Sequence, residues 1–396
     1  MARLVLLLNC GSSSIKYQVI DADTEGVVAS GLVQKVGQDA IGTLDHSVGG
    51  ETHHVEHRFG THAGALGTVM EQFREHGPNL DEVIAVGHRT VHGGRTFKHT
   101  TMITSAVVDK LIDLYEVAPL HNPAAVAGIE GAQAALPDVP HVAVFDTAFF
   151  SDLPAEAQTY ALPTDLSEEL GILKYGFHGT SHDYVSSAAA EFLGKTRKEL
   201  KIIVLHLGNG ASASAIDGGR PIETSMGLTP MQGLVMGTRS GDIDPGLVAF
   251  LHRKKGWKAA KIDDVLNKQS GMLGLTGRTD MREVKVLVDE GDERAINGVN
   301  VYVHRLVSYI GSYTALLGGL DALVFTAGVG ENADWIRELV VNRLAPFGVE
   351  LDAEANATRS KEARAISTPT SKVKVLVVPT NEELAMVRQV VATLAE

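Results

Sequence analysis

The sequence predicts an α/β protein built from two copies of one domain, and two observations lead to this prediction. A glycine- and serine-rich turn, Asn9–Lys16, lies between two strand-like apolar segments, and a second turn of this kind, Gly208–Ser214, lies between two more such segments half a chain later. When Gly210 is laid over Gly11, the apolar residues before the two turns coincide. Strand-like and helical patterns also alternate along the chain. A repeated strand–turn–strand unit within such an alternation indicates a duplicated α/β domain.

The elements of the first half follow from apolar periodicity and from turn residues. The pair Asn122-Pro123 is typical of a helix start, with Asn122 as the N-cap and the proline in the first turn. We predict strands over 4–9, 17–21, 27–36, 83–87 and 141–145, helices over 63–75, 107–117 and 122–136, and strand edges and loops over 38–60.

The second half contains the same kinds of element and two long irregular segments. We predict strands over 201–207, 215–217, 322–326 and 373–378, helices over 180–193, 263–268, 297–317, 334–344 and 382–394, and loops over 223–245 and 270–282. Thr180 and Thr380 are expected to cap their helices, and the last helix is expected to pack on the N-terminal domain. Because a long connection without periodicity is usually functional, we expect 223–245 to be an ordered site loop.

Composition excludes several function classes. The chain has 396 residues and a formal net charge of −13, which argues against a nucleic-acid-binding surface. Its single Cys10 permits no internal disulfide, and no segment reaches the roughly 18 apolar residues of a membrane span, so a cytoplasmic location is expected. The histidines His46, His53, His54 and His57 lack an ordered metal-ligand spacing and are expected on a solvated surface.

The first glycine turn suits a phosphate group. Backbone N–H groups, the hydroxyls of Ser12, Ser13 and Ser14, and the charge of Lys16 all lie within one short segment. The alternative is an ordinary hairpin with a polar turn, and this stretch alone does not decide between them.

Two further segments follow predicted strands. Asp146 comes directly after strand 141–145, and a carboxylate at this position commonly faces a crevice in α/β proteins. The glycine-rich stretch 328–332 lies between a strand and a helix, an arrangement that often binds an anion or a nucleotide at the helix N-terminus.

Longer motifs carry a resemblance to a known family. They read NCGSSSIK from Asn9, HRTVHGG from His88, FHGTSH from Phe177, HLGNGAS from His206, TSMGLTPMQGLVMGTRSGDIDP from Thr224, SGMLGLTG from Ser270, FTAGVGEN from Phe325 and PTNEEL from Pro379. Over essentially its whole length the chain resembles the acetokinase family, within the sugar-kinase/actin/heat-shock ATPase superfamily. The block from Thr224 to Pro245 is the most specific of these motifs.

The resemblance implies two duplicated actin-like ATPase domains, each with a ribonuclease H-like βββαβαβα core, and a cleft between them. The expected N-terminal domain covers 1–150 and is completed by the helix 384–396, and the nucleotide-binding domain covers 151–383. The implied activity is reversible in-line phosphoryl transfer between ATP and acetate, with Mg²⁺ or Mn²⁺, in a homodimer. A propionate or butyrate kinase of the same family and an actin-like ATPase module are the alternatives.

The resemblance also implies roles for single residues. Arg239 is expected on the transferring phosphoryl group, because its planar fork of donors fits that group, and its alternative is an ion pair with Asp242 or Asp244. Arg89 is expected to clamp the substrate carboxylate opposite Arg239, with a domain-interface ion pair as the alternative. His178 is expected to stabilise the transition state, or else to act only as a cap.

Asp146 matches the family position described as proton donor or acceptor. A carboxylate substrate is already ionised at neutral pH, so Asp146 could instead hold a metal-bound water. The apolar pocket around the substrate is expected from Val91, Leu120, Phe177 and Pro230.

The remaining expectations concern the nucleotide and the metal. The residues expected to hold phosphates and adenosine are Lys16, His206, Leu207, Gly208, Asn209, Gly210, Asp280, Met281, Arg282, Gly328, Val329, Gly330, Glu331 and Asn332. Asn9 and Glu382 are the expected metal-linked positions. A capping box from Thr380 to Glu383 would leave Glu382 available as a hard oxygen ligand.

Overall fold

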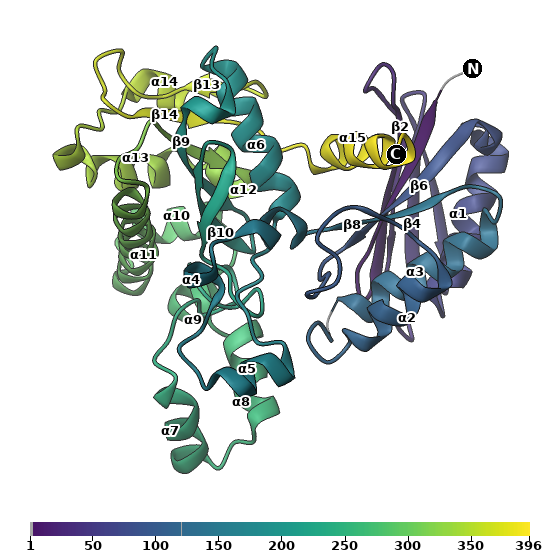
Figure 1. The fold of residues 1–396 in the computed structure, drawn as a ribbon, viewed down its shortest axis with the longest axis horizontal. Helices are drawn as coiled ribbons and strands as arrows, with labels where there is room; N and C mark the ends of the chain where they lie inside the picture. Colours follow the sequence, from purple (N-terminus) through teal and green to yellow (C-terminus); the bar gives the residue numbers. More distant parts are fainter. Residues whose placement is uncertain (1–2, 120) are drawn as a thin grey trace. The chain divides into compact units, whose positions relative to one another are not determined.

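The chain folds into two compact units (Figure 1). The computed structural model describes residues 3–119 and 121–396. The N-terminal unit comprises Met1–Ser151 with Asn381–Glu396, and the C-terminal unit comprises Asp152–Thr380. The expected limits were 150 and 384, so Asn381, Glu382 and Glu383 belong to the N-terminal unit rather than the second one. They do so because the last helix, α15 (Glu382–Leu394), begins at Glu382 and packs on the N-terminal sheet.

The described part of the N-terminal unit contains an eight-stranded mixed sheet in the order β5-β4-β3-β2-β1-β6-β8-β7. Its strands are β1 (Leu4–Cys10), β2 (Ser14–Asp21), β3 (Val27–Gln34), β4 (Gly42–Val48), β5 (Glu51–His57), β6 (Val83–Thr90), β7 (Thr101–Met102) and β8 (His141–Phe145). β1 is antiparallel to β2 and parallel to β6, and β6 is parallel to β8. The parallel centre brings the carboxyl ends of β1, β6 and β8 to one edge.

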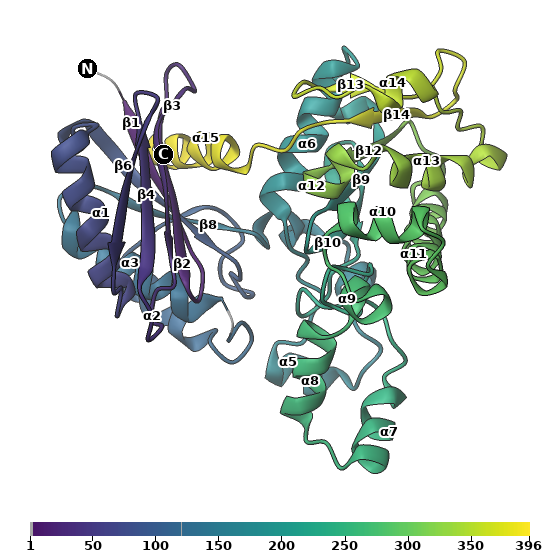
Figure 2. The ribbon, with the colours of Figure 1, turned by 180° about the vertical axis from the view of Figure 1, so that it is seen from behind.

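Helices cover both faces of this sheet. They are α1 (His62–His76), α2 (Ser105–Asp113), α3 (Asn122–Ala135) and α15, with short 3₁₀ turns η1 (Leu80–Glu82) and η2 (Ala148–Asp152). Figures 1 and 2 show α1 and α3 on one face and α15 on the other. The C-terminal helix thus completes the N-terminal unit.

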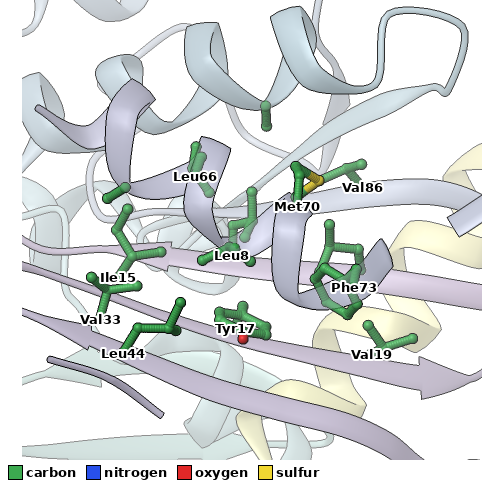
Figure 3. Packing of buried hydrophobic residues seen from close by; sticks show 14 of the residues in the cluster. Leu8, Ile15, Tyr17, Val19, Val33, Leu44, Leu66, Met70, Phe73 and Val86 are labelled. Atoms are coloured by element: carbon green, nitrogen blue, oxygen red, sulfur yellow. The ribbon is translucent and has the colours of Figure 1, made fainter. Parts of the chain in front are cut away.

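Apolar packing fixes these helices. In Figure 3, Leu66, Met70 and Phe73 of α1 lie over Leu8 and Tyr17 of the sheet, and all five side chains are buried. On the opposite face, a second buried cluster joins the α15 residues Met386, Val387 and Val390 to β1, β6 and β8. Full burial of each such side chain contributes about 1.5–3 kcal/mol.

The C-terminal unit repeats the same core. The described residues form a six-stranded sheet in the order β11-β10-β9-β12-β14-β13. Its strands are β9 (Lys201–Leu207), β10 (Ala211–Asp217), β11 (Arg220–Thr224), β12 (Ala322–Thr326), β13 (Arg364–Ala365) and β14 (Lys374–Val377). β9 is antiparallel to β10 and parallel to β12, as β1 is to β2 and β6. The predicted duplication is therefore present.

The structure aligns the residues of the two glycine turns differently from the overlay that the sequence suggested. Gly11 N donates to Ser14 O (2.8 Å), and Gly208 N donates to Gly210 O (3.0 Å). Gly11 therefore corresponds to Gly208, and its overlay on Gly210 was wrong. The first turn is longer, since Cys10 pairs with Ile15 across it whereas Leu207 pairs with Ala211. In the sequence overlay, residues of the same kind coincided, although they do not occupy equivalent positions in the two turns.

Helices also pack on both faces of the C-terminal sheet. They are α4 (Ala155–Gln158), α5 (Thr164–Leu170), α6 (Gly179–Phe192), α7 (Gly246–Lys255), α8 (Ala259–Lys268), α9 (Gly271–Thr276), α10 (Met281–Asp289), α11 (Glu293–Leu317), α12 (Ala327–Asn332), α13 (Asp334–Asn342) and α14 (Ala353–Ala357), with 3₁₀ turns η3 (Arg197–Glu199) and η4 (Ala345–Phe347). Figures 1 and 2 show α6 on one face and α11 and α13 on the other. No helix in the described ranges is both long enough and apolar enough to cross a bilayer.

Several local predictions were wrong. The segment 270–282 is not a loop, since it contains α9 and the start of α10, and the glycine-rich stretch 328–332 is not a turn but lies within α12. Glycine lowers helix propensity by only about 1 kcal/mol per residue, which tertiary packing can offset.

Three predicted helix caps were also wrong. The cap positions are His121, His178 and Asn381 rather than Asn122, Thr180 and Thr380. The Asn122 amide instead donates to the His92 carbonyl (3.1 Å). Thr180 lies inside α6. The hydroxyl of Thr380 bonds to Ser181 (2.9 Å).

The histidine-rich segment 38–60 forms two full strands, β4 and β5, and His46 was wrongly expected on the surface. Its side chain is buried. His46 Nε2 donates to the Gly77 carbonyl (3.0 Å), so Nδ1 accepts from the Tyr17 hydroxyl (2.7 Å). Burial lowers the pKa of His46 and favours this neutral form.

Two further buried histidines, His88 and His141, lie in neighbouring strands of this sheet. His141 Nε2 donates to the Leu136 carbonyl (3.0 Å), and His141 Nδ1 therefore accepts from His88 Nε2 (2.9 Å). Burial lowers the pKa of His88 to about 3. Both rings are neutral in the folded protein at pH 7, and their hydrogen bonds join β6 to β8.

We therefore expect acid to destabilise the protein through His88. Between pH about 6.5 and about 3, the unfolded chain binds a proton at this residue and the folded chain does not, so the free energy of unfolding falls by up to roughly 1.4 kcal/mol per pH unit. Urea denaturation of the full chain over this pH range measures the slope. The variant His88→Gln should show a shallower slope, and an unchanged slope would contradict the assignment.

Candidate active site

A charged cluster lies at the carboxyl edge of the N-terminal sheet. Arg89 lies near the end of β6, Asp146 follows β8, and Glu382 begins α15. Arg89 donates from Nε to Asp146 Oδ1 and from Nη2 to Asp146 Oδ2, both at 3.0 Å. Glu382 Oε2 lies 3.3 Å from Arg89 Nη2. The register of β6 against β8, in which Thr90 pairs with Phe145, makes Arg89 and Asp146 neighbours.

Burial and charge act against each other in this pair. The side chain of Asp146 is 4% exposed and that of Arg89 is 22% exposed. Burial raises the pKa of Asp146, and the guanidinium of Arg89 limits that rise. The charge of Asp146 in turn raises the pKa of Arg89. Two-point binding leaves Nη1 of Arg89 without a hydrogen bond to any described residue, so this edge is available to a second carboxylate.

The predicted metal-linked residues line one small pocket in this unit, together with Lys16 and Glu383. Glu383 forms an ion pair with Lys16 rather than a capping box. Across the described residues, no group of three or more His, Cys, Asp or Glu side chains is arranged to hold a metal ion. Mg²⁺ needs no such group, because it commonly binds one or two carboxylates, several waters and the substrate's phosphates. The oxygen donors of Asn9 and Glu382 fit that partial set.

A second cluster surrounds the glycine turn of the C-terminal unit. The rings of His178 and His206 are stacked, with centroids 4.2 Å apart. His178 Nδ1 lies 2.9 Å from Ser212 Oγ, and His206 Nδ1 lies 2.8 Å from Ser181 Oγ. His178 has a backbone φ of 58°, a left-handed conformation that is uncommon for a residue other than glycine. Such strain occurs most often at functional sites.

Arg239 lies beside these histidines without a carboxylate partner. A Cβ at Gly210 would lie 3.4 Å from Arg239 Nη1 and 3.5 Å from the ring of His178, so the glycine leaves space between them. Arg239 Nη1 donates to the Pro230 carbonyl (3.0 Å). In the described ranges Arg239 forms no ion pair, and the alternative partners are engaged elsewhere, Asp242 with Arg305 and Asp244 with the backbone. Burial lowers the pKa of Arg239.

The loop that carries Arg239 is ordered by α11. Arg305 Nη1 donates to the Gly233 carbonyl (2.9 Å), and the Tyr309 hydroxyl donates to Asp242 Oδ2 (2.7 Å). Gly233 N also donates to Asp242 Oδ1 (2.9 Å). The expectation of an ordered segment is therefore confirmed, although no helix or strand lies between Thr224 and Gly246.

A pocket of about 460 Å³ opens next to this turn, within the size range of small-molecule sites. Eight of the residues predicted for the nucleotide line it: Gly208, Asn209, Asp280, Met281, Arg282, Gly328, Val329 and Asn332. A Cβ at Gly237 would come 2.0 Å from the Asn209 side chain, so glycine is needed there. The pocket also contains Trp335 and Arg359.

The structure does not bring every predicted nucleotide residue to this pocket. Leu207 is fully buried in β9, and Lys16 lies in the N-terminal unit. Glu331 Oε1 accepts from the N–H groups of Ala327 (2.9 Å) and Thr380 (3.1 Å). The carbonyl of Gly330 accepts from the buried Arg337 (3.0 Å). The carboxylate of Glu331 thus accepts from the backbone N–H group of Ala327 at the start of α12, where an anion was expected to bind.

The residues expected to form the apolar pocket belong to both units. Val91 lies after β6 in the N-terminal unit, whereas Phe177 and Pro230 lie in the C-terminal unit. Phe177 is buried, and Pro230 contributes its carbonyl to Arg239. Leu120 lies outside the described residues.

Sequence reasoning missed several residues of these sites. Ser181 and Ser212 hold the two histidines, and Thr279, Tyr302 and Trp335 line the large pocket. The motifs FHGTSH and HLGNGAS contained the two serines, but neither serine was assigned a role. Trp335, three residues after the GVGEN motif, could have been noticed because only two tryptophans occur in the chain.

Comparison with known proteins agrees with this geometry. The family model described as "Acetokinase family" matches residues 4–388. The chain belongs to the acetokinase family. It is 52% identical over 394 residues to the acetate kinase of Clavibacter michiganensis subsp. michiganensis, covering 99% of each chain, and 50% identical over 398 residues to that of Streptomyces griseus subsp. griseus, covering 99% of this chain and 96% of the relative.

Solved structures of the acetokinase family share the fold. The acetate kinase of Porphyromonas gingivalis matches with a TM-score of 0.94 and 41% identity, covering 100% of each chain. A propionate kinase from Francisella tularensis subsp. tularensis matches with a TM-score of 0.92 and 39% identity, covering 98% of each chain. The α/β fold of duplicated actin-like ATPase domains is thereby confirmed, and the protein is a phosphotransferase with ATP and ADP as substrates.

We expect nucleotide binding to be visible in the fluorescence of Trp335. Trp335 lines the large pocket, whereas the other tryptophan, Trp257, lies between α7 and α8 and does not line it. Titration with ADP should change the emission of the wild type and of Trp257→Phe, and the change should be lost in Trp335→Phe. A signal that persists in Trp335→Phe would place the nucleotide elsewhere.

Proposed function

We propose that the protein is an acetate kinase, which transfers the γ-phosphoryl group of ATP reversibly to acetate and yields acetyl phosphate and ADP. Membership of the acetokinase family supports the reaction class. The observation that carries the residue assignment is the partly buried guanidinium of Arg239, which has no carboxylate partner in the described ranges and faces the glycine turn beside His178. An anion bound at the glycine turn would stabilise the positive charge of Arg239.

The chemistry is an in-line displacement. A carboxylate oxygen of acetate forms a bond to the γ-phosphorus, while the bond from that phosphorus to the β,γ-bridging oxygen breaks and ADP takes the electron pair. A carboxyl group titrates near pH 4, so acetate is ionised at neutral pH and needs no general base. Arg239, His178 and His206 would donate hydrogen bonds to the phosphoryl oxygens, where negative charge must be stabilised during transfer.

The large pocket would hold ATP or ADP, with Gly208, Gly210 and Asn209 next to the phosphates. Mg²⁺, or Mn²⁺ in its place, would neutralise phosphate charge when bound. Asn9 and Glu382 would be its protein ligands. Lys16, paired with Glu383, would add a positive charge near the polyphosphate.

Arg89 would hold the acetate carboxylate through Nη1. Asp146 would then orient Arg89 through the two-point ion pair rather than carry a proton, since both of its oxygens are occupied by the guanidinium. Val91, Phe177 and Pro230 remain the proposed apolar surroundings of the methyl group. A homodimer and a cytoplasmic location belong to the same proposal, and the exposed Leu166 and Leu170 of α5 offer apolar surface for a dimer.

Propionate is the second candidate substrate, because a propionate kinase has nearly the same fold. Incubation of the protein with ATP and each of acetate, propionate and butyrate, followed by hydroxylamine trapping of the acyl phosphate, measures the preference. We expect the highest kcat/KM with acetate. ATP hydrolysis without trapped acyl phosphate would instead support an actin-like ATPase and contradict the proposal.

Variants at the two arginines should separate their roles. Arg239→Ala should lower kcat about 10²–10³-fold, equivalent to about 2.7–4 kcal/mol, because it removes a preorganised donor to the transition state. Arg89→Ala should raise KM for acetate far more than KM for ATP, because it removes a contact to one substrate only.

Steady-state kinetics with each substrate varied in turn measure these effects. Arg58→Ala is the control, because Arg58 is exposed, forms an ion pair with Asp39 and lines neither pocket. An unchanged kcat in Arg239→Ala, or an equal rise of both KM values in Arg89→Ala, would contradict the assignment.

A further inference from the structure

A chain of buried polar groups lies behind His178. His182 Nε2 lies 2.7 Å from Ser212 Oγ, the same hydroxyl that lies 2.9 Å from His178 Nδ1. On its other side, His182 Nδ1 lies 2.7 Å from Ser214 Oγ. His182, Ser212 and Ser214 are all fully buried. His178 is the N-cap of α6 and His182 lies in its first turn, whereas the two serines are two residues apart along β10 and therefore lie on one face of that strand.

The hydrogens in this chain can run in only two directions. Burial lowers the pKa of His182 well below its usual value, so its ring is neutral and has one donor and one acceptor nitrogen. Ser212 has a single hydroxyl hydrogen and contacts two ring nitrogens. In one direction, Ser214 donates to His182, His182 donates to Ser212, and Ser212 donates to His178. In the other direction, His178 donates to Ser212, Ser212 donates to His182, and His182 donates to Ser214.

Ser214 decides between the two directions. Among the described residues, His182 Nδ1 is the one group that its hydroxyl contacts. If His182 donated to Ser214, the hydroxyl hydrogen of Ser214 would be buried without an acceptor, and leaving a buried donor unsatisfied is destabilising. Ser214 therefore donates to His182 Nδ1. His182 Nε2 then donates to Ser212, and Ser212 donates to His178 Nδ1.

We propose that His182 is a positioning residue that, through Ser212, keeps the ring hydrogen of His178 on Nε2. His178 Nδ1 accepts from Ser212, so in the neutral ring Nε2 carries the hydrogen. A Cβ at Gly210 would lie 3.5 Å from His178 Nε2 and 3.4 Å from Arg239 Nη1, so the two donors face the same space at the glycine turn. In the opposite tautomer, a lone pair on Nε2 would face that space.

The catalytic consequence rests on the proposed function, in which that space holds the phosphoryl group. Phosphoryl oxygens accept hydrogen bonds and repel a lone pair, so only the Nε2–H tautomer of His178 assists transfer. The stacked ring of His206 and the guanidinium of Arg239 also lie near His178.

Nitrogen NMR of the substrate-free protein tests the tautomer directly. In protein labelled with ¹⁵N-histidine, we expect His178 to show a protonated Nε2 and a bare Nδ1. The signals are assigned by their loss in His178→Asn, which tolerates the left-handed backbone. Ser214→Ala should convert His178 to a mixture of tautomers. A wild-type His178 with its hydrogen on Nδ1, or signals unchanged in Ser214→Ala, would overturn the proposal.

Kinetics of matched variants test the consequence. Ser214→Ala should lower kcat roughly tenfold, less than loss of a whole donor, with KM values changed less than twofold. His182→Gln should retain kcat within about threefold, because its amide can donate to Ser212 and accept from Ser214, whereas His182→Leu should fall at least tenfold. Ser186→Ala is the control, because Ser186 is buried on the same helix and, among the described residues, its hydroxyl bonds only to the Asp183 carbonyl.

These outcomes separate the two proposals. If the NMR signals of His178 shift in Ser214→Ala while kcat stays unchanged, the tautomer assignment stands and the proposed role of His178 in phosphoryl transfer fails. If His182→Gln and His182→Leu lose kcat equally and the folded protein shows the same His178 signals in both, the positioning role is wrong.

Discussion

Parallel pairing at the centre of each sheet is the constraint on which both clusters depend. β1, β6 and β8 are parallel neighbours in one unit, and β9, β12 and β14 are parallel neighbours in the other. Because the carboxyl ends of parallel strands lie at one edge, residues distant in sequence meet there. Arg89 and Asp146 become partners only through the register of β6 against β8. His206 and Thr326, which precede the glycine turn and α12, are paired by the register of β9 against β12.

The two arginines differ in how the fold treats their charge. Arg89 is held by two bonds to a buried carboxylate and lies close to a second one, so its orientation is fixed before any substrate arrives. Arg239 has a carbonyl contact and no carboxylate in the described ranges. A buried charge without a partner costs free energy that an anionic ligand can recover. The first arrangement suits selection of a carboxylate, and the second suits charge that develops during a reaction.

The histidines show how a buried polar network can fix the position of a ring hydrogen, including that of His178, for which a catalytic role is proposed. His88 with His141 and His46 with Tyr17 are neutral pairs that join strands. His178 lies at the end of a longer chain whose far end, Ser214, has one acceptor in reach among the described residues. In a buried network the direction of every hydrogen bond follows from the most restricted member. A single hydroxyl in a strand can thereby act on a ring three residues beyond it in the network.

The sequence by itself determined the class of fold, the duplication and most of the elements, because strands such as β9 and helices such as α11 carry clear apolar periodicity. The sequence also pointed to Arg239 and to the second glycine turn as candidate site residues, because each lies within one continuous motif. It did not determine the caps of α3, α6 and α15 or the helices α9 and α12, because glycine-rich segments and polar helix starts have weak local preferences that packing overrides. The burial of His46, the pairing of Arg89 with Asp146 and the serines behind His178 were decided only by the tertiary structure. Each of these depends on the register of one strand against another or on the seating of a helix on a sheet, and that geometry joins residues that no local pattern connects.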